Sequence, residues 1–201
     1  PGKENLLQLH GDSKKFKAKP TGREIGGIKA RLTKTESIRD LRIEQIAKAL
    51  TNGHTIQPGV TPFSEESLSK GYKGTRKEDF TEQTLFMIDI DNKAEAPLES
   101  PAHVTEVLAA HNLRPSFMYE TFGSTEEAPR FRFALVADTP FTDKEQRDRV
   151  QTSLISLFPQ ADADCVNADV RVLVFQTCSC FKRISVKCIK NARNSVTDKS
   201  M

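Results

Sequence analysis

An apolar run that ends in two alternating aspartates limits the fold of this chain more than any other stretch. Residues 85–93 read LFMIDIDNK, so four apolar residues lead directly into Asp89-Ile90-Asp91. On a strand, side chains two positions apart point to the same face, with Cα atoms about 6.5 Å apart. Such a strand places Asp89 and Asp91 on one face and Ile88 and Ile90 on the other. Because an unpaired buried charge is costly, we predict that the isoleucines face a core and the aspartates face a site.

Two carboxylates at this spacing favour a divalent cation, because like charges this close repel each other unless a cation lies between them. Mg²⁺ and Mn²⁺ are commonly bound by one or two carboxylates together with substrate phosphates. Sites that hold two such ions catalyse phosphoryl transfer. The alternative is structural: Asp91 and Asn92 end the strand, and Asp89 pairs with a lysine.

The order of elements after residue 84 predicts the fold class. Hydrophobic patterning indicates four strands and two helices, namely strands at 84–91, 116–122, 130–137 and 170–176 and helices at 101–112 and 142–158. Ser100 and Pro101 suit the start of the first helix, and Thr142 with Glu145 suits a capping box at the second. The resulting βαββαβ order is typical of an α+β, ferredoxin-like or RRM-like sheet. Its two helices cover one face, and we predict that the other face is open to a ligand.

The rest of the chain is predicted to flank this core within a single domain over residues 1–201. Its three parts are an N-terminal α/β extension over 1–83, the βαββαβ core over 84–177, and an extra strand with a polar tail over 178–201. In the extension, we predict an irregular or hairpin-like arm up to residue 35. A helix then runs from residue 36 to Asn52-Gly53, and a basic loop leads to the core.

Two further pairs of charged residues are predicted to reach the aspartates. Asp162 and Asp164 lie just before the last core strand, which neighbours the first strand in a ferredoxin-like sheet, and either could supply a third carboxylate. Arg130 and Arg132 alternate along one strand, so both can face the same site. They would either neutralise a triphosphate as planar donors or form a ladder of cross-strand ion pairs.

The turn before that strand, GSTEEAP, contains two small hydroxyl residues, Ser124 and Thr125. Their hydroxyls and the free backbone N–H groups of a tight turn could cradle a phosphate. An ordinary hairpin turn explains the same residues about as well. Both therefore stand as candidate nucleotide-binding residues.

Basic residues are concentrated in two segments, although the formal net charge of the chain is only +3. Residues 14–34 carry eight lysines and arginines against one acid, Glu24. The segment SKGYKGTRK carries four more: Lys70, Lys73, Arg76 and Lys77. Such clusters attract polyanions, and the alternative is a solvated face with no partner.

The remaining features predict a soluble, cytoplasmic protein. No apolar run approaches the length of a membrane span, and no hydrophobic signal segment is visible. The cysteines lack the paired spacing of common zinc modules, so we expect reduced thiols and no zinc. The four cysteines are Cys165, Cys178, Cys180 and Cys188.

Three motifs follow one another along the chain: LFMIDIDN, YETFGSTEEAPRFRFAL and FPQADADCVNADVRVLVFQT. In this order they resemble the motifs of the archaeo-eukaryotic primase superfamily. The likeness is greatest to the primase or primase-polymerase domains in replication proteins of phages, plasmids and integrated elements, and it covers roughly residues 38–177. The chain departs from the family in two places, because no histidine stands in the second motif and VFQT replaces the F-G-T of the third.

The resemblance implies a template-directed nucleotidyltransferase that makes or extends primers with two Mg²⁺ or Mn²⁺ ions. The catalytic acids and metal ligands would be Asp89, Asp91 and Asp162, with Asp164 as a rival and Asp169 as a weaker candidate. The nucleotide would be held by Ser124, Thr125, Arg130 and Arg132. From the basic clusters we expect the DNA template to lie across a channel built from the N-terminal arm and the loop that carries Lys70, Lys73, Arg76 and Lys77.

The implied partners are single-stranded DNA, nucleoside triphosphates and a replicative helicase, in the cytoplasm of a bacterial host. Two other classes of function stay open: a metal-dependent nuclease, and a non-catalytic single-stranded nucleic-acid-binding module with a degenerate primase fold. RNA-recognition modules display aromatic side chains on the open face of the sheet. Here that face would display Asp89 and Asp91, which argues against such a module.

Overall fold

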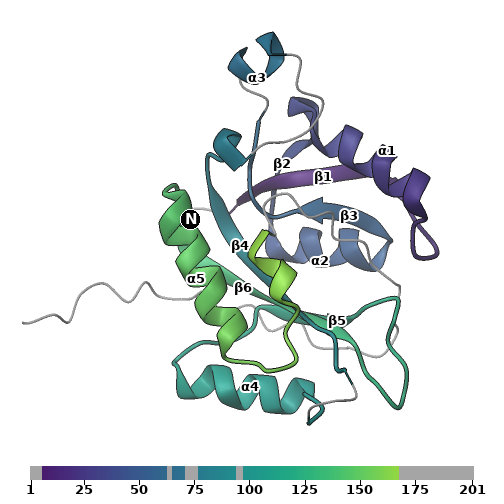
Figure 1. Cartoon of the computed structure of the whole chain (residues 1–201), viewed down its shortest axis with the longest axis vertical. Coiled ribbons are helices and arrows are strands. Elements are labelled where there is room, and N and C mark those ends of the chain that lie inside the picture. The colour runs from purple at the N-terminus through teal and green to yellow at the C-terminus, as the bar shows by residue number, and fades with distance from the viewer. Residues whose placement is uncertain (1–5, 63–64, 71–76, 94–96, 168–201) are drawn as a thin grey trace, which may run out of the picture.

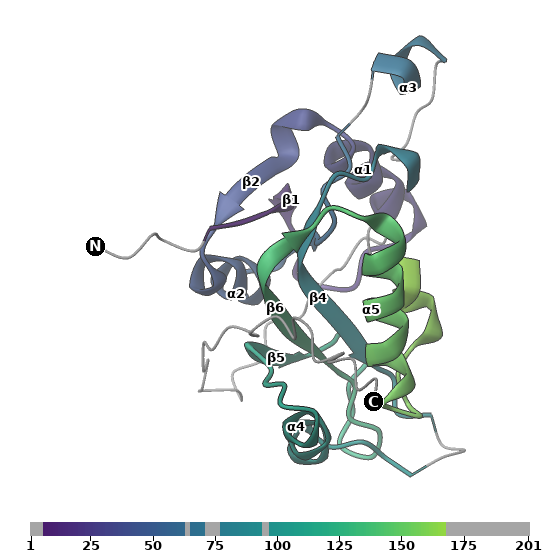
Figure 2. The same cartoon turned by 90° about the vertical axis from the view of Figure 1, so that its left-hand side faces the viewer.

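The computed structural model describes residues 6–62, 65–70, 77–93 and 97–167 as a mixed α/β structure (Figures 1 and 2). Two three-stranded antiparallel sheets form its centre. The first has the order β2-β1-β3, with β1 at Leu7–Lys15, β2 at Ile38–Leu41 and β3 at His54–Gln57. The second has the order β4-β6-β5, with β4 at Gln83–Ile90, β5 at Phe117–Glu120 and β6 at Phe131–Phe141. The helices are α1 (Gly22–Leu32), α2 (Ile43–Thr51), α3 (Glu65–Ser69), α4 (Pro101–Ala110) and α5 (Lys144–Ser156), with short 3₁₀ turns η1 (Thr35–Ser37), η2 (Lys77–Asp79) and η3 (Ala163–Asn167).

One face of the second sheet is covered by α4 and α5. Phe86, Ile88 and Ile90 point to this face and lie in one core with Val104 of α4 and Leu154 of α5. Burying a side chain of this size stabilises a fold by roughly 1.5–3 kcal/mol. The predicted core positions of the two isoleucines are confirmed.

The opposite face of this sheet is covered as well, so the predicted open face is wrong along most of β4. Leu85 and Met87 point to this side and pack against Leu9 of β1 and Ile46 of α2. Figure 1 shows the first sheet and α2 lying over this side of β4 and β6. Both faces of β4 carry apolar side chains up to Met87, and both therefore need a covering layer. The polar part of the face begins only at Asp89.

The N-terminal arm is a strand followed by a helix, not the irregular or hairpin-like arm that we predicted. β1 pairs with β2 on one side and with β3 on the other, and α1 buries Ile28 and Leu32 against Phe16. The helix predicted from residue 36 begins only at Ile43, because residues 38–41 pair with β1 as an edge strand. These pairings join residues 28 to 47 positions apart in the chain, which local patterning does not reveal.

The two predicted core helices are present. Ser100 accepts a hydrogen bond from the His103 backbone N–H at 3.1 Å, and a proline opens the helix, as predicted. At the second helix the cap is Asp143 rather than Thr142, and it accepts from the Gln146 backbone N–H at 3.0 Å. A carboxylate at this position also faces the positive end of the helix dipole. No helix in the described ranges is long and apolar enough to cross a membrane.

The order β4-β6-β5 places the third predicted core strand between the first and the second, as a ferredoxin-like sheet does. The strands predicted at 170–176 and within 178–201 lie outside the described residues, so the complete core order stays a prediction. Next to β4, residues 160–162 form an isolated antiparallel bridge between Ala161 and Ile90. The segment that carries Asp162 therefore lies beside the end of β4.

A buried histidine links the first sheet to the loop after β3. His10 is fully buried, its Nδ1 lies 2.7 Å from Ser37 Oγ, and its Nε2 accepts from the Thr61 backbone N–H at 3.0 Å. Because Nε2 is an acceptor, the ring is neutral and Nδ1 carries the proton that it donates to Ser37. Burial lowers the pKa of His10 to about 4.

This low pKa predicts a loss of stability in mild acid. Between pH 6.5 and pH 4 the unfolded chain protonates His10 and the folded chain does not, so the free energy of unfolding falls by roughly 1.4 kcal/mol per pH unit from this group. Urea unfolding at a series of pH values from 7 to 4.5 measures the slope of the free energy of unfolding against pH. His10→Gln, which can keep both hydrogen bonds, should give a shallower slope in this window. Equal slopes in the two proteins would contradict the assignment.

Candidate active site

Three side chains form a row across the second sheet at the end of β4. The register places Asp89 opposite Arg132, and Arg132 opposite Tyr119 of β5. Arg132 donates through Nη2 to the Asp89 carboxylate and through Nη1 to the Tyr119 hydroxyl, the latter at 3.2 Å. The side chains of Asp89 and Arg132 are only 13% and 8% exposed, so this ion pair is almost dry.

The charge state of this row follows from its burial. Burial raises the pKa of Tyr119 well above its usual range, so the phenol is neutral. Burial by itself lowers the pKa of Arg132, but Tyr119 and Asp89 outweigh it and the net shift is upward. The row therefore holds a permanent guanidinium cation, with the carboxylate of Asp89 as its counter-ion and the neutral hydroxyl of Tyr119 as its second contact.

A second, more exposed pair lies next to the first. Asp91 follows β4 directly and Arg130 precedes β6, and their Oδ1 and Nη1 atoms are 3.6 Å apart. About a third of each side chain is exposed, 31% for Asp91 and 39% for Arg130. The two arginines thus form the cross-strand ladder of ion pairs that was one of the two predicted arrangements. Their role toward a triphosphate stays a prediction.

Of the two candidate third acids, Asp162 lies beside Asp89. Its backbone N–H donates to the Asp89 carbonyl at 2.9 Å, and the Asp91 N–H donates to the Gln160 carbonyl at 3.0 Å. Directly opposite residues in such a pairing have Cβ atoms about 4.5–5.5 Å apart and point to the same side. Asp164 is exposed in η3 and donates its backbone N–H to Asp162 Oδ1 at 3.0 Å. Asp169 lies outside the described residues.

Tyr119 and Cys165 belong to this cluster, although the sequence did not indicate them as site residues. Cys165 is 2% exposed, and its backbone N–H donates to the Asp162 carbonyl at 3.0 Å. Burial raises the pKa of its thiol, and the charges of Arg132 and Asp89 act on it. It is the one cysteine within the described ranges, and it is a free thiol. A buried, protonated thiol packs there as a small apolar group.

The turn that carries Ser124 and Thr125 is held together by its own hydrogen bonds. The Ser124 hydroxyl accepts from the Arg130 backbone N–H at 3.1 Å, and the Thr125 hydroxyl accepts from the Ala128 N–H at 3.1 Å. Their backbone N–H groups donate to carbonyls within the same loop. The predicted free N–H groups are therefore absent at these two residues, while each hydroxyl keeps a proton that it can donate.

Asn92, immediately after the second aspartate, fixes the loops around the site. It is 2% exposed and has a φ of 31°, in the left-handed region that asparagine tolerates. Its Nδ2 donates to the carbonyls of Glu99 and Pro129 at 2.8 and 2.6 Å, and its Oδ1 accepts from the Glu99 N–H at 2.7 Å. One side chain thus ties the end of β4 to the residues before α4 and before β6.

Gln160 performs the same task from the other side. Its Oε1 accepts from the Lys93 N–H at 2.7 Å, and its Nε2 donates to the Lys93 and Pro97 carbonyls at 3.0 and 3.1 Å. Sequence patterning missed both amides, since their partners are backbone groups up to 67 positions away. The sequence offered one hint of this role, since a polar residue, Asn92, directly follows the D-x-D motif at the end of an apolar run.

The donor set at the end of β4 suits a hard divalent cation in its chemistry. Asp89, Asp91 and Asp162 lie on neighbouring backbone segments there, and Oδ1 of Asp89 is buried without a hydrogen bond to any described residue. Oxygen ligands of this kind are those that Mg²⁺ and Mn²⁺ prefer. Within the described ranges, no three His, Cys, Asp or Glu side chains are placed to share one metal ion. The positive charges that the aspartates contact are those of Arg132 and Arg130.

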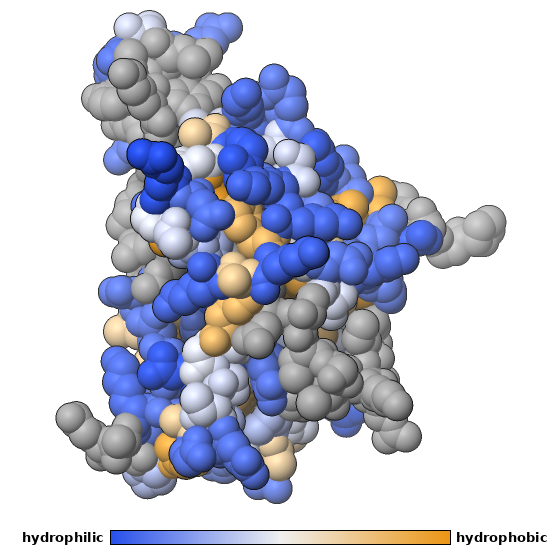
Figure 3. Space-filling model, turned by 90° about the vertical axis from the view of Figure 1, so that its right-hand side faces the viewer, coloured by the Kyte–Doolittle hydropathy of each residue, from blue (hydrophilic) through white to orange (hydrophobic). Residues whose placement is uncertain are grey.

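Of the predicted DNA-binding residues, Lys70 directly follows α3 and lies away from the acids. Lys73 and Arg76 fall outside the described residues, Lys77 begins η2, and Lys70 is exposed and pairs with Glu66. Figures 1 and 2 both show α3 beyond the N-terminal end of β4, whereas the acids stand at its C-terminal end. Figure 3 shows the side of the molecule that carries α1, which is largely hydrophilic around a narrow apolar strip. Seven basic residues of the first segment are exposed: Lys14, Lys15, Lys17, Lys19, Arg23, Lys29 and Lys34.

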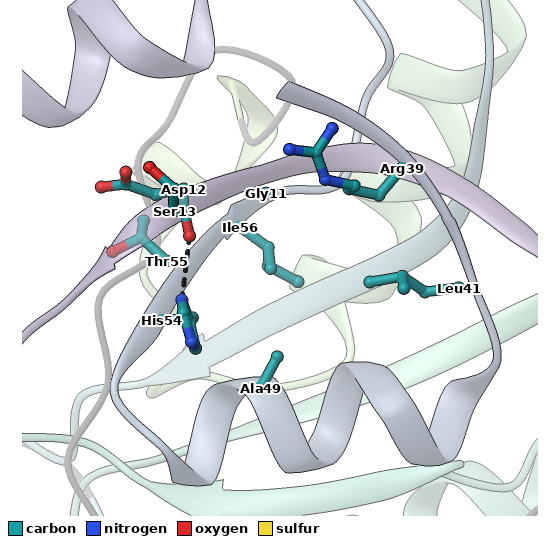
Figure 4. A pocket seen from close by; sticks show the side chains of 9 residues that line it. All are labelled: Gly11, Asp12, Ser13, Arg39, Leu41, Ala49, His54, Thr55 and Ile56. Atoms are coloured by element: carbon teal, nitrogen blue, oxygen red, sulfur yellow. Dashed lines mark hydrogen bonds between the residues drawn. The ribbon is translucent and has the colours of Figure 1, made fainter. Parts of the chain in front are cut away.

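A cavity of about 220 Å³ lies between the first sheet and α2, and none of the predicted site residues lines it (Figure 4). Leu41, Ala49 and Ile56 form its apolar floor, with Arg39 and His54 at its sides. The Nδ1 atom of His54 lies 2.9 Å from the backbone carbonyl oxygen of Asp12 in β1. The charged groups of the acid cluster are therefore separate from this cavity.

Comparisons with known proteins give one likeness. No protein-family model matches the chain, and no curated protein matches its sequence. Among solved structures, the chain is similar to the AEP domain of the primase-polymerase (PrimPol) of cyanophage S-2L, with 18% sequence identity and a TM-score of 0.37. The match covers 69% of this chain and 62% of that domain.

Proposed function

We propose that this protein is a template-directed nucleotidyltransferase, a DNA primase or primase-polymerase that uses Mg²⁺ or Mn²⁺. The observation that supports it best is the meeting of Asp162, Asp89 and Arg132 in one line, with Asp91 and Arg130 beside them. In this line Asp89 has a carboxylate neighbour on one side and an arginine on the other, and Asp91 with Arg130 forms a second pair of an acid and an arginine. Nucleotidyl transfer needs both kinds of group, acids for the metal ions and planar donors for the triphosphate.

In this proposal each residue has a distinct task. Asp89, Asp91 and Asp162 hold the cations, which when bound activate the attacking 3′-hydroxyl and neutralise the leaving pyrophosphate. Arg130 and Arg132 bind the triphosphate and orient it for in-line attack. Tyr119 holds the guanidinium of Arg132 in place through its hydroxyl. The Ser124 and Thr125 hydroxyls, at the rim of the site, donate to the outer phosphates.

An extension assay tests the proposal and separates it from its rivals. The protein is incubated with a single-stranded DNA template, labelled nucleotides and Mg²⁺ or Mn²⁺, with and without a primer. We expect labelled products longer than the primer, and products without a primer would show priming as well. Shortening of the template would indicate a nuclease instead, and template binding without either reaction would indicate a binding module.

The template is proposed to run along β4, from the N-terminal end of this strand, near Lys70, to the acids at its C-terminal end. β4 has eight residues, so its ends are about 25 Å apart. A strand with about 3.4 Å per nucleotide needs roughly seven or eight nucleotides to cover that length. Its phosphates would be contacted by Lys70 and by the exposed lysines of β1, of α1 and of the segment between them, which carries Lys17 and Lys19.

Binding of single-stranded DNA should therefore weaken steeply as salt rises, because each phosphate contact releases counter-ions. Replacing Lys15, Lys17 and Lys19 with glutamine should lower the slope of log K against log salt by roughly 0.7 for each lysine that contacts a phosphate. The matched control replaces three exposed basic residues elsewhere: Lys48, Arg114 and Arg149. Fluorescence anisotropy with a labelled oligonucleotide measures both slopes. Equal slopes for the two triple variants would remove this surface from the template path.

A further inference from the structure

We propose that the cavity between the first sheet and α2 is a second ligand site, which binds a heterocyclic ring that carries a phosphate monoester. The cavity is separate from the acids at the end of β4, so this inference goes beyond the proposed function and does not rest on it. A free nucleotide has this chemistry, and so does the 5′-phosphorylated end of a strand. The glycine that opens the cavity, the cavity's lining and the charge at its mouth each support the assignment.

The cavity exists because a glycine interrupts a row of large apolar side chains. Alternate residues of β1 point to the same face, and on the face toward α2 this row reads Leu7, Leu9 and Gly11. Both leucines are buried in the core that α2 covers, whereas Gly11 lines the cavity. Within the described ranges, a β-carbon added at Gly11 would contact only Arg39 Cγ, at 3.6 Å, so the position has room for a side chain. A glycine inside a strand often marks a place where a ligand approaches the backbone closely.

The lining of the cavity suits a heterocyclic ring. Leu41, Ala49 and Ile56 point toward one another and form an apolar floor (Figure 4). At the edge, the His54 ring donates through Nδ1 to the Asp12 carbonyl at 2.9 Å, which leaves Nε2 for a ligand. A heterocycle has apolar faces and a polar edge, so it matches both kinds of surface. The volume of about 220 Å³ is below the range of about 300–1,000 Å³ for drug-sized ligands, so one ring fits inside and the rest of the ligand lies at the mouth.

The side chain at the mouth of the cavity is a cation without a counter-ion among the described residues. Arg39 is exposed, and its Nη1 donates to the backbone carbonyls of Glu36 and Ile38. The nearby carboxylate of Asp12 is bound to Arg31 instead. An exposed guanidinium gains little from a single carboxylate. A phosphate monoester carries about 1.5 to 2 negative charges and three acceptor oxygens, so it is the better match for the planar donors of Arg39.

Isothermal titration calorimetry in EDTA tests this site, because without a divalent cation the proposed nucleotidyltransferase site lacks its metal ions. The probes are thymidine 5′-monophosphate, thymidine and inorganic phosphate. We expect the monophosphate to bind at least about tenfold more tightly than either half alone, because the cavity holds the ring and Arg39 holds the phosphate. A 5′-phosphorylated oligothymidylate, compared with its unphosphorylated form, tells whether the end of a strand binds as the free nucleotide does. Equal affinities for inorganic phosphate and the monophosphate would overturn the proposal.

Gly11→Val fills the cavity and should weaken binding of the monophosphate at least about tenfold. Arg39→Gln should weaken it about tenfold and leave the affinity for thymidine unchanged. The matched controls, Gly26→Val and Arg114→Gln, change exposed positions outside the cavity and should bind as the wild type does. If Gly11→Val does not fold, the exposed Arg39→Gln decides, and wild-type affinity there would overturn the proposal. Binding that Arg130→Gln abolishes and Gly11→Val leaves intact would place the nucleotide at the acids and overturn the proposal equally.

Discussion

Replacing Asp89 with asparagine should lower template-dependent nucleotide incorporation by at least roughly 100-fold. Asparagine has the same shape but no negative charge, so it cannot hold a divalent cation in the way a carboxylate does. Even residues that only support metal ligands cost 10- to 100-fold in affinity or activity when they are changed. A primer-extension time course measures the loss. Asp40→Asn is the matched control, because Asp40 is exposed and its hydrogen bond to Gln8 survives the change.

The same substitution also disturbs the fold, and the two effects must be separated. Without the Asp89 carboxylate, Arg132 is a buried cation without its counter-ion, which costs about 3–5 kcal/mol of stability. The double variant Asp89→Asn with Arg132→Gln removes both charges and leaves two amides that can bond to each other. It should recover most of the stability in urea unfolding and none of the incorporation. Recovery of both would mean that Asp89 is a structural partner of Arg132 and not a catalytic residue.

The sequence predicted the strand that carries these acids because its signal is local. Apolar residues alternate with the aspartates over a few positions, and this alternation placed Ile88 and Ile90 in the core, where the structure has them. That Arg130 and Arg132 share one face was predictable for the same reason, since they repeat the two-residue spacing of the acids. Which of the two predicted arrangements the arginines adopt depended on the register between β4 and β6, which local spacing does not fix.

The N-terminal layer was missed because its buried polar residues resemble surface residues in the sequence. Asp12 is buried in β1, where it accepts two hydrogen bonds from the Arg31 guanidinium at 2.6 and 2.7 Å. His10, on the same strand, is buried with Ser37 and Thr61 as partners. Each partner is far away in the chain, so in the sequence the residues of β1 looked like an exposed polar segment and not like a strand with a buried face. The covering of β4 by this layer, and with it the loss of the open face, could not be predicted from local pattern.

Replacing Asn92 with alanine should lower the free energy of unfolding by about 3–5 kcal/mol. The change leaves two carbonyls and one N–H of the loops without the Asn92 amide, and an unmade buried hydrogen bond costs about 1–3 kcal/mol. The positive φ adds a further cost, since alanine adopts this region less readily than asparagine. Urea unfolding measures the difference. Asn92→Gly relieves the backbone cost only and should recover about 1 kcal/mol of the loss.

Asn112 provides the control, because it also has a positive φ, 58°, but is exposed. Asn112→Ala should cost about 1 kcal/mol from the backbone alone, and a similar cost at both positions would show that the Asn92 amide contributes nothing. The stability loss alone does not tell whether Asn92 also positions the acids. Activity of Asn92→Gly, measured well below its unfolding midpoint and per folded molecule, answers that question. If the amide merely stabilises the loops, this activity equals that of the wild type, but if it aims Asp91, the rate falls while the protein is still folded.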